Sequence, residues 1–255
     1  MIDVNAYLGH FAFRQLRHNT ADSLLRMMDR AGIERACVSS AASITYRNAQ
    51  SGNEEVAAGV RGQSRLTMFA VLNPAYAGWR DDLTICHEEF GARGLRLYPR
   101  WHGYKLDAPE CLELCAGAAS RGLPVSIPLR VEDRRQQSWL VDVPDVAHEE
   151  IAGLIRAVPS AKFILGNGSG FIGSSLGKPG GAALNYSIEI SLLTAAIQDE
   201  LGRLAANLGA DRLLFGTGMP FHYPDPSILK LKIAALPEPD KEKIRSGNAR
   251  RLLGL

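Results

Sequence analysis

The chain opens with Met1-Ile2-Asp3-Val4-Asn5-Ala6-Tyr7-Leu8-Gly9, a short apolar run that ends on glycine. This pattern is typical of a buried β-strand followed by a turn. Side chains two residues apart lie on the same face of a strand, so the polar groups of Asn5 and Tyr7 should point the same way. The stretch therefore predicts a first strand with polar side chains at its carboxyl end.

Strand-like and helix-like segments alternate through the rest of the chain. Apolar strand candidates lie at 34–40, 65–73, 92–98, 123–129, 162–167, 186–191 and 212–216. Most are followed by helical spacing, and the first helix is bounded by the capping residue Thr20 and by Gly32. Eight strands alternating with helices are typical of a (β/α)8 TIM barrel. An open doubly wound sheet is the alternative, but its first turn is usually glycine-rich, whereas this one is aromatic and arginine-rich.

Length and composition narrow the class of protein. The 255 residues match one (β/α)8 barrel, so a single domain over residues 1–255 is predicted. With 46% hydrophobic and 22% charged residues, the composition is that of an ordinary soluble globular protein. The net charge of +2 gives no argument for nucleic acid or a membrane as partner. The four cysteines have no metal or redox spacing, and no transmembrane span or signal peptide is apparent, so a cytoplasmic location is expected.

Both ends of the chain resemble the amidohydrolase superfamily, specifically its second branch, which contains metal-dependent hydrolases and decarboxylases. The likeness is carried by the opening strand, by Arg212-Leu213-Leu214-Phe215-Gly216-Thr217-Gly218-Met219-Pro220-Phe221 and by Gly247-Asn248-Ala249-Arg250-Arg251-Leu252-Leu253. Residues 94–99 and 122–125 fit the fourth and fifth strands of that family. The resemblance spans essentially the whole chain and implies an amidohydrolase-like barrel.

The metal ligands that this resemblance implies are replaced. The family uses a His-x-His pair on strand one, a histidine at the ends of strands five and six, and an aspartate after strand eight. This chain has Asn5, Tyr7, Pro128, Asn167 and Gly218 at these five positions. A divalent transition metal needs three or four good nitrogen, oxygen or sulfur ligands. We therefore expect no metal at the usual place and no other cofactor.

The densest group of charges, Arg130-Val131-Glu132-Asp133-Arg134-Arg135, follows the fifth predicted strand. Active sites of barrels lie at this end of the strands. Arg130 is two residues beyond Pro128, so we expect it to point into the mouth and to hold a carboxylate or phosphate. Glu132 or Asp133 is then a candidate general base. The alternative is a solvated loop whose charges pair with one another.

Three histidines are candidates for the same mouth. His102 is the best placed and could act as an acid or base near neutral pH. The turn around it, Trp101-His102-Gly103-Tyr104, equally suits a structural role, because similar turns occur in metal-bearing relatives. His10 and His222 are the other two, and each could instead bond to its own loop.

Two amides, one on the first strand and one at the end of the sixth, and a glycine-rich segment after the sixth strand are each open to two interpretations. Asn5 and Asn167 either bind a ligand or fill a decayed metal site with mutual hydrogen bonds. The Gly- and Ser-rich segment 166–181 offers backbone N–H groups that could hold an anion. It matches no phosphate-binding motif, so a flexible loop is the favoured interpretation.

Two functions remain open. In the first, the chain is a hydrolase-like enzyme or a lyase that acts on a small carboxylated or anionic substrate without the usual metal. The candidate catalytic residues are Glu132, Asp133 and His102, and the candidate substrate-binding residues are Arg130, Arg96, Tyr98, Tyr7, Asn5, Asn167 and His222. In the second, it is a non-catalytic pseudoenzyme barrel that binds a partner or serves a structural role. A formed pocket at the mouth would favour the first, and a filled mouth the second; a homo-oligomer is compatible with both.

Overall fold

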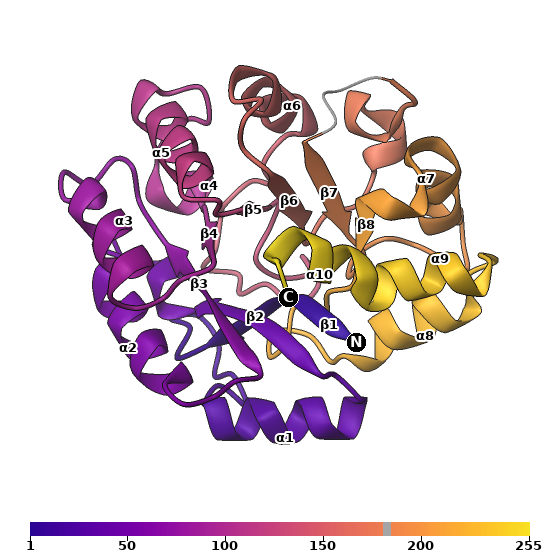
Figure 1. Ribbon diagram of the computed structural model, residues 1–255, viewed down its shortest axis with the longest axis horizontal. Helices are drawn as coiled ribbons and strands as arrows, with labels where there is room; N and C mark the ends of the chain where they lie inside the picture. The colour runs from indigo at the N-terminus through magenta and orange to yellow at the C-terminus, as the bar shows by residue number, and fades with distance from the viewer. Residues whose placement is uncertain (181–184) are drawn as a thin grey trace.

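Eight parallel strands, paired in sequence order, form the centre of the computed structural model, which describes residues 1–180 and 185–255. The strands are β1 (Ile2–Leu8), β2 (Arg35–Ser40), β3 (Leu66–Val71), β4 (Gly94–Arg96), β5 (Val125–Pro128), β6 (Phe163–Gly166), β7 (Tyr186–Glu189) and β8 (Leu213–Leu214). Backbone hydrogen bonds join the two ends of the sheet: Val4 N donates to Phe215 O at 3.0 Å, and Gly218 N to Asn5 O at 2.7 Å. The predicted (β/α)8 barrel is confirmed (Figure 1).

Helices surround the strands (Figure 1). They are α1 (Ala21–Ala31), α2 (Gln50–Val60), α3 (Trp79–Glu88), α4 (Pro99–His102), α5 (Pro109–Ser120), α6 (His148–Ala157), α7 (Glu200–Leu208), α8 (Asp225–Ile233), α9 (Glu238–Glu242) and α10 (Asn248–Leu253). Thr20 caps α1, since its Oγ1 accepts a hydrogen bond from Ser23 N, and Gly32 ends it at φ 66°. None of the helices in the described part of the chain is long and apolar enough to span a membrane.

Short turns of helix complete the connections. These are η1 (Ala42–Ile44), η2 (Phe171–Gly173), η3 (Ser175–Gly177), η4 (Ala210–Arg212) and η5 (Lys243–Gly247). The Gly- and Ser-rich segment contains η2 and η3, so as far as residue 180 it is more ordered than expected; Gly181 lies outside the described residues.

The apolar core has one large layer and two smaller clusters. The large layer lies between strands and helices and includes Leu24, Met28 and Ile155. One small cluster contains Ile2, Val4, Cys37, Phe69, Ile164 and Leu214 of the strands together with Ala249 of α10. The second small cluster lies at the carboxyl end of the strands and contains Tyr7, Phe11, Leu16, Ala41, Ile44, Ala49, Val71, Tyr98, Val131 and Phe221. The barrel is therefore packed at both ends, as its hydrophobic strands require.

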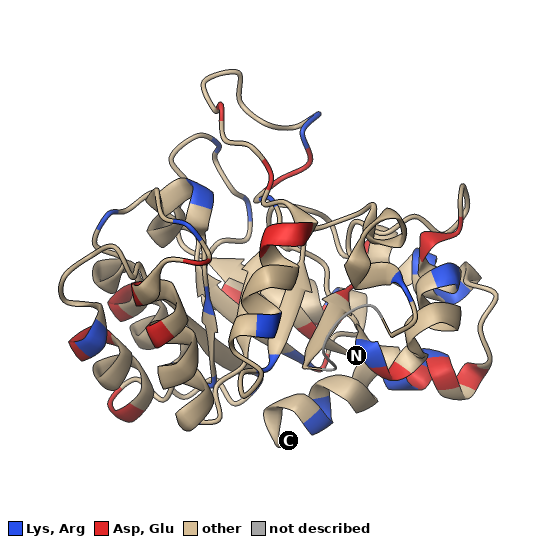
Figure 2. Ribbon diagram, turned by 90° about the horizontal axis from the view of Figure 1, so that it is seen from above, with Lys and Arg blue, Asp and Glu red and all other residues tan. Residues whose placement is uncertain are grey.

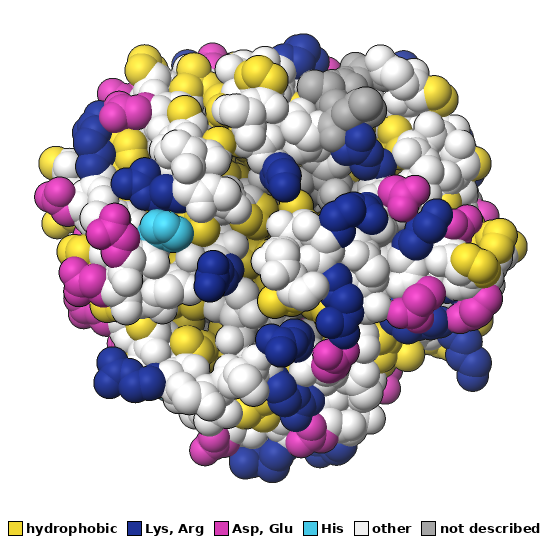
Figure 3. All heavy atoms as spheres, in the orientation of Figure 1, with side chains coloured by type: hydrophobic (Ala, Val, Ile, Leu, Met, Phe, Trp, Pro, Cys, Tyr) yellow, Lys and Arg dark blue, Asp and Glu magenta, His cyan; other side chains and the backbone are white. Residues whose placement is uncertain are grey.

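Helix α10 lies across the amino-terminal end of the strands (Figure 1). Its Asn248 donates from Nδ2 to Ala210 O and to Leu213 O, both at 2.8 Å, which holds the helix against β8. Arg250 forms an ion pair with Glu34 at 2.7 Å. The same face, drawn in Figure 3, carries scattered Lys and Arg side chains with apolar atoms between them. Helix α10 closes this end of the barrel, so a site is expected at the opposite end, where the strands have their carboxyl ends.

Several strands end earlier than the sequence indicates, including β3 at Val71 and β4 at Arg96, and two of these ends border the mouth near Glu189 and Thr217. Strands were expected over 186–191 and 212–216, but β7 ends at Glu189 and β8 at Leu214. Beyond these points some backbone groups still bond to a neighbouring strand, as Ile190 N does to Leu214 O at 3.0 Å. Others bond to side chains: Ser191 N donates to the Glu189 carboxylate, and Thr217 N donates to Asp3 Oδ1 at 3.1 Å. Side chains at the mouth thus supplement the backbone hydrogen bonds of the barrel.

Candidate functional site

Polar side chains from three strand ends fill the centre of the barrel mouth. Asn5 of β1 donates from Nδ2 to Asn167 Oδ1 at 2.7 Å and to Glu189 Oε2 at 3.0 Å. Asn167 follows β6, and its backbone N–H donates to the same Glu189 oxygen at 3.1 Å. Ser191 donates from Oγ to Glu189 Oε2 at 2.8 Å, and its backbone N–H bonds to Oε1. These four buried residues form a closed hydrogen-bonded group, called here the central network.

The backbone around the central network is shaped to admit it. A Cβ on Gly216 would lie 2.4 Å from Glu189 Cγ, so glycine is needed at that position. Asn167 has φ 47°, in the left-handed region that asparagine tolerates better than most residues. Burial raises the pKa of Glu189, and the four hydrogen bonds it accepts oppose that shift. The carboxylate is therefore held by the fold and is not open to solvent.

Two further titratable side chains, the partly buried Lys230 and the fully buried Asp3, support the mouth. Lys230 of α8 donates from Nζ to Ile190 O at 2.7 Å and to Ser191 O at 2.6 Å. Burial lowers the Lys230 pKa to about 8, and the Glu189 charge opposes the shift. Asp3 holds β1 to the segment after β8, because Thr217 Oγ1 donates to Asp3 Oδ2 at 2.5 Å. Burial raises the Asp3 pKa to about 7.

Arg96 and Tyr7 are packed against each other inside the barrel. The Arg96 guanidinium lies 4.7 Å from the centre of the Tyr7 ring and donates to Val4 O at 3.1 Å, Ala6 O at 3.1 Å and Ser39 Oγ at 2.9 Å. Tyr7 OH accepts a hydrogen bond from Asn167 Nδ2 at 3.2 Å. Both side chains are fully buried. The structure therefore places these two predicted binding residues in internal contacts.

The ring of His222 covers Gly218, the position where the family's aspartate would stand. A Cβ on Gly218 would lie 2.7 Å from His222 Cδ2 and 3.4 Å from Asn167 Oδ1. Burial, with a smaller contribution from Arg14, lowers the His222 pKa to about 4, while the Asp133 charge raises it. The imidazole is therefore neutral near pH 7. Its buried Nε2 has no hydrogen-bond partner among the residues described.

A cavity of about 700 Å³ opens beside the central network. Its polar walls include Arg14, Arg17, Asp133, Arg135, Ser191 and His222. Leu16 and Phe221 add apolar surface. Arg14 joins three of the surrounding loops, because it forms an ion pair with Glu132 at 3.2 Å and donates to Phe221 O at 2.8 Å. The cavity thus combines several cations with one carboxylate and an apolar wall.

The charged residues that follow β5 point in two directions, some toward Asp145 and others toward the large cavity. Arg130 forms an ion pair with Asp145 at 2.6 Å, and Arg134 reaches the same carboxylate at 3.2 Å. Asp133 lines the large cavity and pairs with Arg135 at 2.7 Å. Hydrogen bonds from Arg135 lower the Asp133 pKa to about 2. Burial raises the pKa of Glu132, which Arg14 partly offsets.

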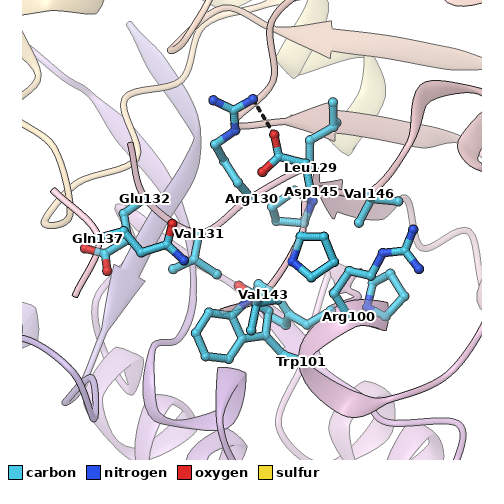
Figure 4. A pocket seen from close by; sticks show the side chains of 14 residues that line it. Arg100, Trp101, Leu129, Arg130, Val131, Glu132, Gln137, Val143, Asp145 and Val146 are labelled. Atoms are coloured by element: carbon cyan, nitrogen blue, oxygen red, sulfur yellow. Dashed lines mark ion pairs between the residues drawn. The ribbon is translucent and has the colours of Figure 1, made fainter. Parts of the chain in front are cut away.

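The space beside Arg130 is small. Figure 4 shows Arg130 turned toward Asp145 at the edge of a pocket that also borders Tyr98 and Glu132. Its volume is about 20 Å³, enough for about one water molecule. The buried Tyr98 hydroxyl has no hydrogen-bond partner in the described part of the chain. The residues grouped by the sequence thus border a pocket too small for a substrate.

His102 lies apart from the large cavity. Its Nε2 is 2.9 Å from Ser43 O, and burial lowers its pKa. The ring packs near Tyr98 and Tyr104, with centroids 6.0 Å and 6.4 Å away. The structure therefore places His102 in a contact between two loops.

Glu189, Asp3, Lys230 and Arg14 are not among the catalytic or binding residues predicted from the sequence, although Arg14 and Glu189 were expected near the mouth. The alternation in Tyr186-Ser187-Ile188-Glu189 could have indicated that Glu189 faces inward at a strand end. Asp3 carried the same signal, since it shares a face with Asn5. Lys230 and Arg14 come from a helix and a loop, whose paths the sequence pattern does not give.

A family model described as amidohydrolase matches residues 13–255 of the chain. The chain belongs to the amidohydrolase family. None of the curated proteins matches this family member. Among solved structures, it is similar to a 2,6-dihydroxybenzoate decarboxylase from Rhizobium (21% identity, 100% of this chain and 99% of that chain covered, TM-score 0.76).

Two other solved structures share the fold of this family member. One is a dihydroxybenzoic acid decarboxylase from Polaromonas sp. JS666 with bound manganese and the inhibitor 2-nitroresorcinol (21% identity, 100% and 96% covered, TM-score 0.76). The other is 5-carboxyvanillate decarboxylase from Sphingomonas paucimobilis (16% identity, 100% and 98% covered, TM-score 0.71). At these identities the likeness establishes the barrel fold.

The residues at the family's metal positions do not fit a divalent metal. The amides of Asn5 and Asn167 are bonded to each other and to Glu189, and Gly218 and Pro128 have no ligating side chain. Tyr7 OH is bonded to Asn167. Within residues 1–180 and 185–255, no group of three or more His, Cys, Asp or Glu side chains is placed to hold a metal ion. Donor sets of this kind do not suit zinc, manganese or iron.

Proposed function

We propose that this amidohydrolase-family chain is a hydrolase- or lyase-type enzyme that acts on a small carboxylated organic molecule, without a metal in the barrel centre. One observation carries the proposal: Asp133 and His222 line the same cavity, beside Arg14, Arg17 and Arg135. The cavity is within the size range of small-molecule sites. The decarboxylases with the same fold support a carboxylated aromatic substrate.

Each side chain has a role that follows from its surroundings. Arg17 and Arg135 lie at the cavity wall and supply positive charge for a carboxylate. His222 is neutral near pH 7 and accepts a proton, and the Asp133 charge favours the imidazolium that forms. Glu132 is not part of the cavity wall, and its ion pair with Arg14 at 3.2 Å positions that cation there. This assignment keeps Asp133 and His222 of the sequence-based set at the cavity and gives Glu132 a positioning role.

The remaining residues of that set are assigned to the scaffold. Arg130 stabilises the loop through Asp145, and His102 joins two loops through Ser43 O. Tyr7, Tyr98, Arg96, Asn5 and Asn167 are buried and packed in the barrel centre. Because Asn5 and Asn167 are bonded to each other and to Glu189, we assign proton transfer to the side chains of the cavity wall.

A second function is favoured by the filled barrel centre: a pseudoenzyme that binds the same ligand without converting it. The central network has its polar groups bonded internally, including the hydroxyl of Ser191, the one member of the network at the cavity wall. On this view the cavity alone recognises small carboxylates. The two functions differ in turnover and not in the place of binding.

A ligand screen followed by a turnover assay separates the two. Thermal shift with small aromatic and aliphatic acids, including 2,6-dihydroxybenzoate, should find stabilising ligands, because a ligand that binds only the folded state raises Tm. Mass spectrometry then follows loss of each ligand. His222→Gln should retain binding and lose turnover by about 10²-fold or more, whereas His87→Gln, on α3, should change neither.

Failure of every acid to raise Tm would contradict both functions. Binding with no loss of any ligand over long incubation would establish the binding-only function. Turnover that survives His222→Gln unchanged would remove that residue from the reaction.

A further inference from the structure

We infer that the loop between β5 and α6 carries a ligand-contacting residue, Trp139, to the open cavity. The inference rests on the proposed function, because it concerns the molecule bound there. Figure 2 shows this loop standing clear of the barrel. Trp139 is 90% exposed, the largest exposure among the large hydrophobic side chains described, and the adjacent Leu140 is 62% exposed.

The loop is directly connected to the cavity. Asp133, Arg135 and Gln136 form part of the cavity wall. Trp139 is only three residues beyond Gln136, and three residues of fully extended chain span at most about 10 Å. A change in the path of this short segment is therefore enough to bring the indole ring to the cavity opening.

The loop is fixed at its base and weakly held at its tip. At the base, Val146 N donates to Leu129 O at 2.9 Å, and Arg130 pairs with Asp145 at 2.6 Å. Toward the tip, the contact to another loop is a 3.3 Å hydrogen bond from Arg14 to Gln136. The residues between β5 and α6 contain no helix or strand, and loops of this length in compact domains usually have a function.

The physical reason for contact is the exposed indole itself. The free energy falls when an exposed aromatic ring packs against another apolar surface and both lose contact with water. A small organic acid bound in the cavity would present one of its faces to the opening, where the indole ring can cover it. Arg135 stands on the same loop, so movement of the tip brings a cation and a flat apolar ring to the ligand together. A tryptophan serving only the fold would be packed, as Trp79 is at 3% exposure.

The test uses the full chain labelled with 5-fluorotryptophan, whose three tryptophans give separate ¹⁹F resonances. Trp139→Phe assigns the resonance of Trp139. In free protein this resonance should show a large shift between H2O and D2O, because the ring is exposed. Saturation with an acid from the screen, such as 2,6-dihydroxybenzoate, should reduce that solvent shift, while the resonance of buried Trp79 stays unchanged.

Binding measurements complete the test. Trp139→Ala should weaken binding about tenfold, which corresponds to about 1.4 kcal/mol. Ile197→Ala is the matched control, since Ile197 is a large hydrophobic residue of similar exposure (77%) on another loop, and it should leave binding unchanged.

The outcomes separate this inference from the function on which it rests. If an acid saturates the protein while Trp139 keeps its full solvent shift, the inference is overturned and the proposed function stands. If Trp139 loses solvent exposure with rising protein concentration and without ligand, it contacts a second copy and the inference is again overturned. If no acid binds, both fail together.

Discussion

The central network and the cavity beside it both contain polar side chains, but they differ in how fully those side chains are hydrogen-bonded. In the network, Glu189 accepts hydrogen bonds from four donors, and Asn5 and Asn167 bond to each other. In the cavity, His222 has an unpartnered Nε2 among the described residues, and Arg135 is 88% exposed. Polar groups that are fully bonded contribute to the fold, whereas unpartnered groups near a cavity are available to a ligand.

This difference indicates where a ligand can bind. The network contains Asn5 and Asn167, two of the five positions where the resemblance places metal ligands, and its polar groups are bonded to one another. The cavity lies beside the network, and its wall includes His222, whose ring covers Gly218. Substitutions in the network should therefore change mainly the stability of the protein, and substitutions at the cavity wall should change mainly ligand binding.

The largest effect is expected for Glu189→Ala. Removal of the Glu189 carboxylate takes away one of the two acceptors of the Asn5 amide, leaves the backbone N–H groups of Asn167 and Ser191 without an acceptor, and opens a void. We expect a loss of about 3–5 kcal/mol in the free energy of unfolding, measured by urea denaturation at pH 7. Glu189→Gln keeps the shape and one acceptor oxygen and should lose less. A loss below about 1 kcal/mol for the alanine variant would mean that the network is not a stabilising element.

An intermediate effect is expected for Gly216→Ala, which tests the shape of the centre and not its charge. The added Cβ would lie 2.4 Å from Glu189 Cγ, so the Glu189 side chain must move. Such overpacking costs about 1–3 kcal/mol. Gly153→Ala is the matched control, because a Cβ there meets nothing within 4 Å on helix α6 and should stabilise by about 0.4–1 kcal/mol. Equal Tm values for the two variants would contradict the close packing of Glu189.

The barrel could be predicted from the sequence because its signals are local. Apolar runs, the Thr20 cap and the terminal Gly32 each depend on a few neighbouring residues, and the structure contains the resulting elements. Strand ends were less predictable. Just beyond the carboxyl ends of β7 and β8, side chains bond to the backbone, as Glu189 does to Ser191, and such contacts have no sequence period.

The site was less predictable because the direction of a loop side chain depends on distant partners. Arg130 was expected in the mouth from its spacing to Pro128, but the strand geometry behind that expectation ends at Pro128. Beyond it, Asp145 supplies the partner that sets the direction of Arg130. His222 was a candidate by position alone, and only the three-dimensional structure shows its ring over Gly218.

The smallest effect on stability is expected for Arg135→Ala, although it should have a clear effect on binding. The side chain is 88% exposed and pairs with Asp133, and exposed ion pairs contribute at most about 1 kcal/mol. The free energy of unfolding should therefore change by less than about 0.5 kcal/mol. Because Arg135 lines the cavity, affinity for a small carboxylate should fall about tenfold in calorimetric titration.

Arg134→Ala is the control for that experiment. Arg134 is the neighbouring residue, is also exposed at 67%, and pairs with Asp145 away from the cavity wall. Its replacement should leave both stability and affinity near the values of the unaltered chain. Equal losses of affinity in the two variants would mean that the loop attracts carboxylates by its overall positive charge. Arg135 would then not be a specific contact for the ligand in the cavity.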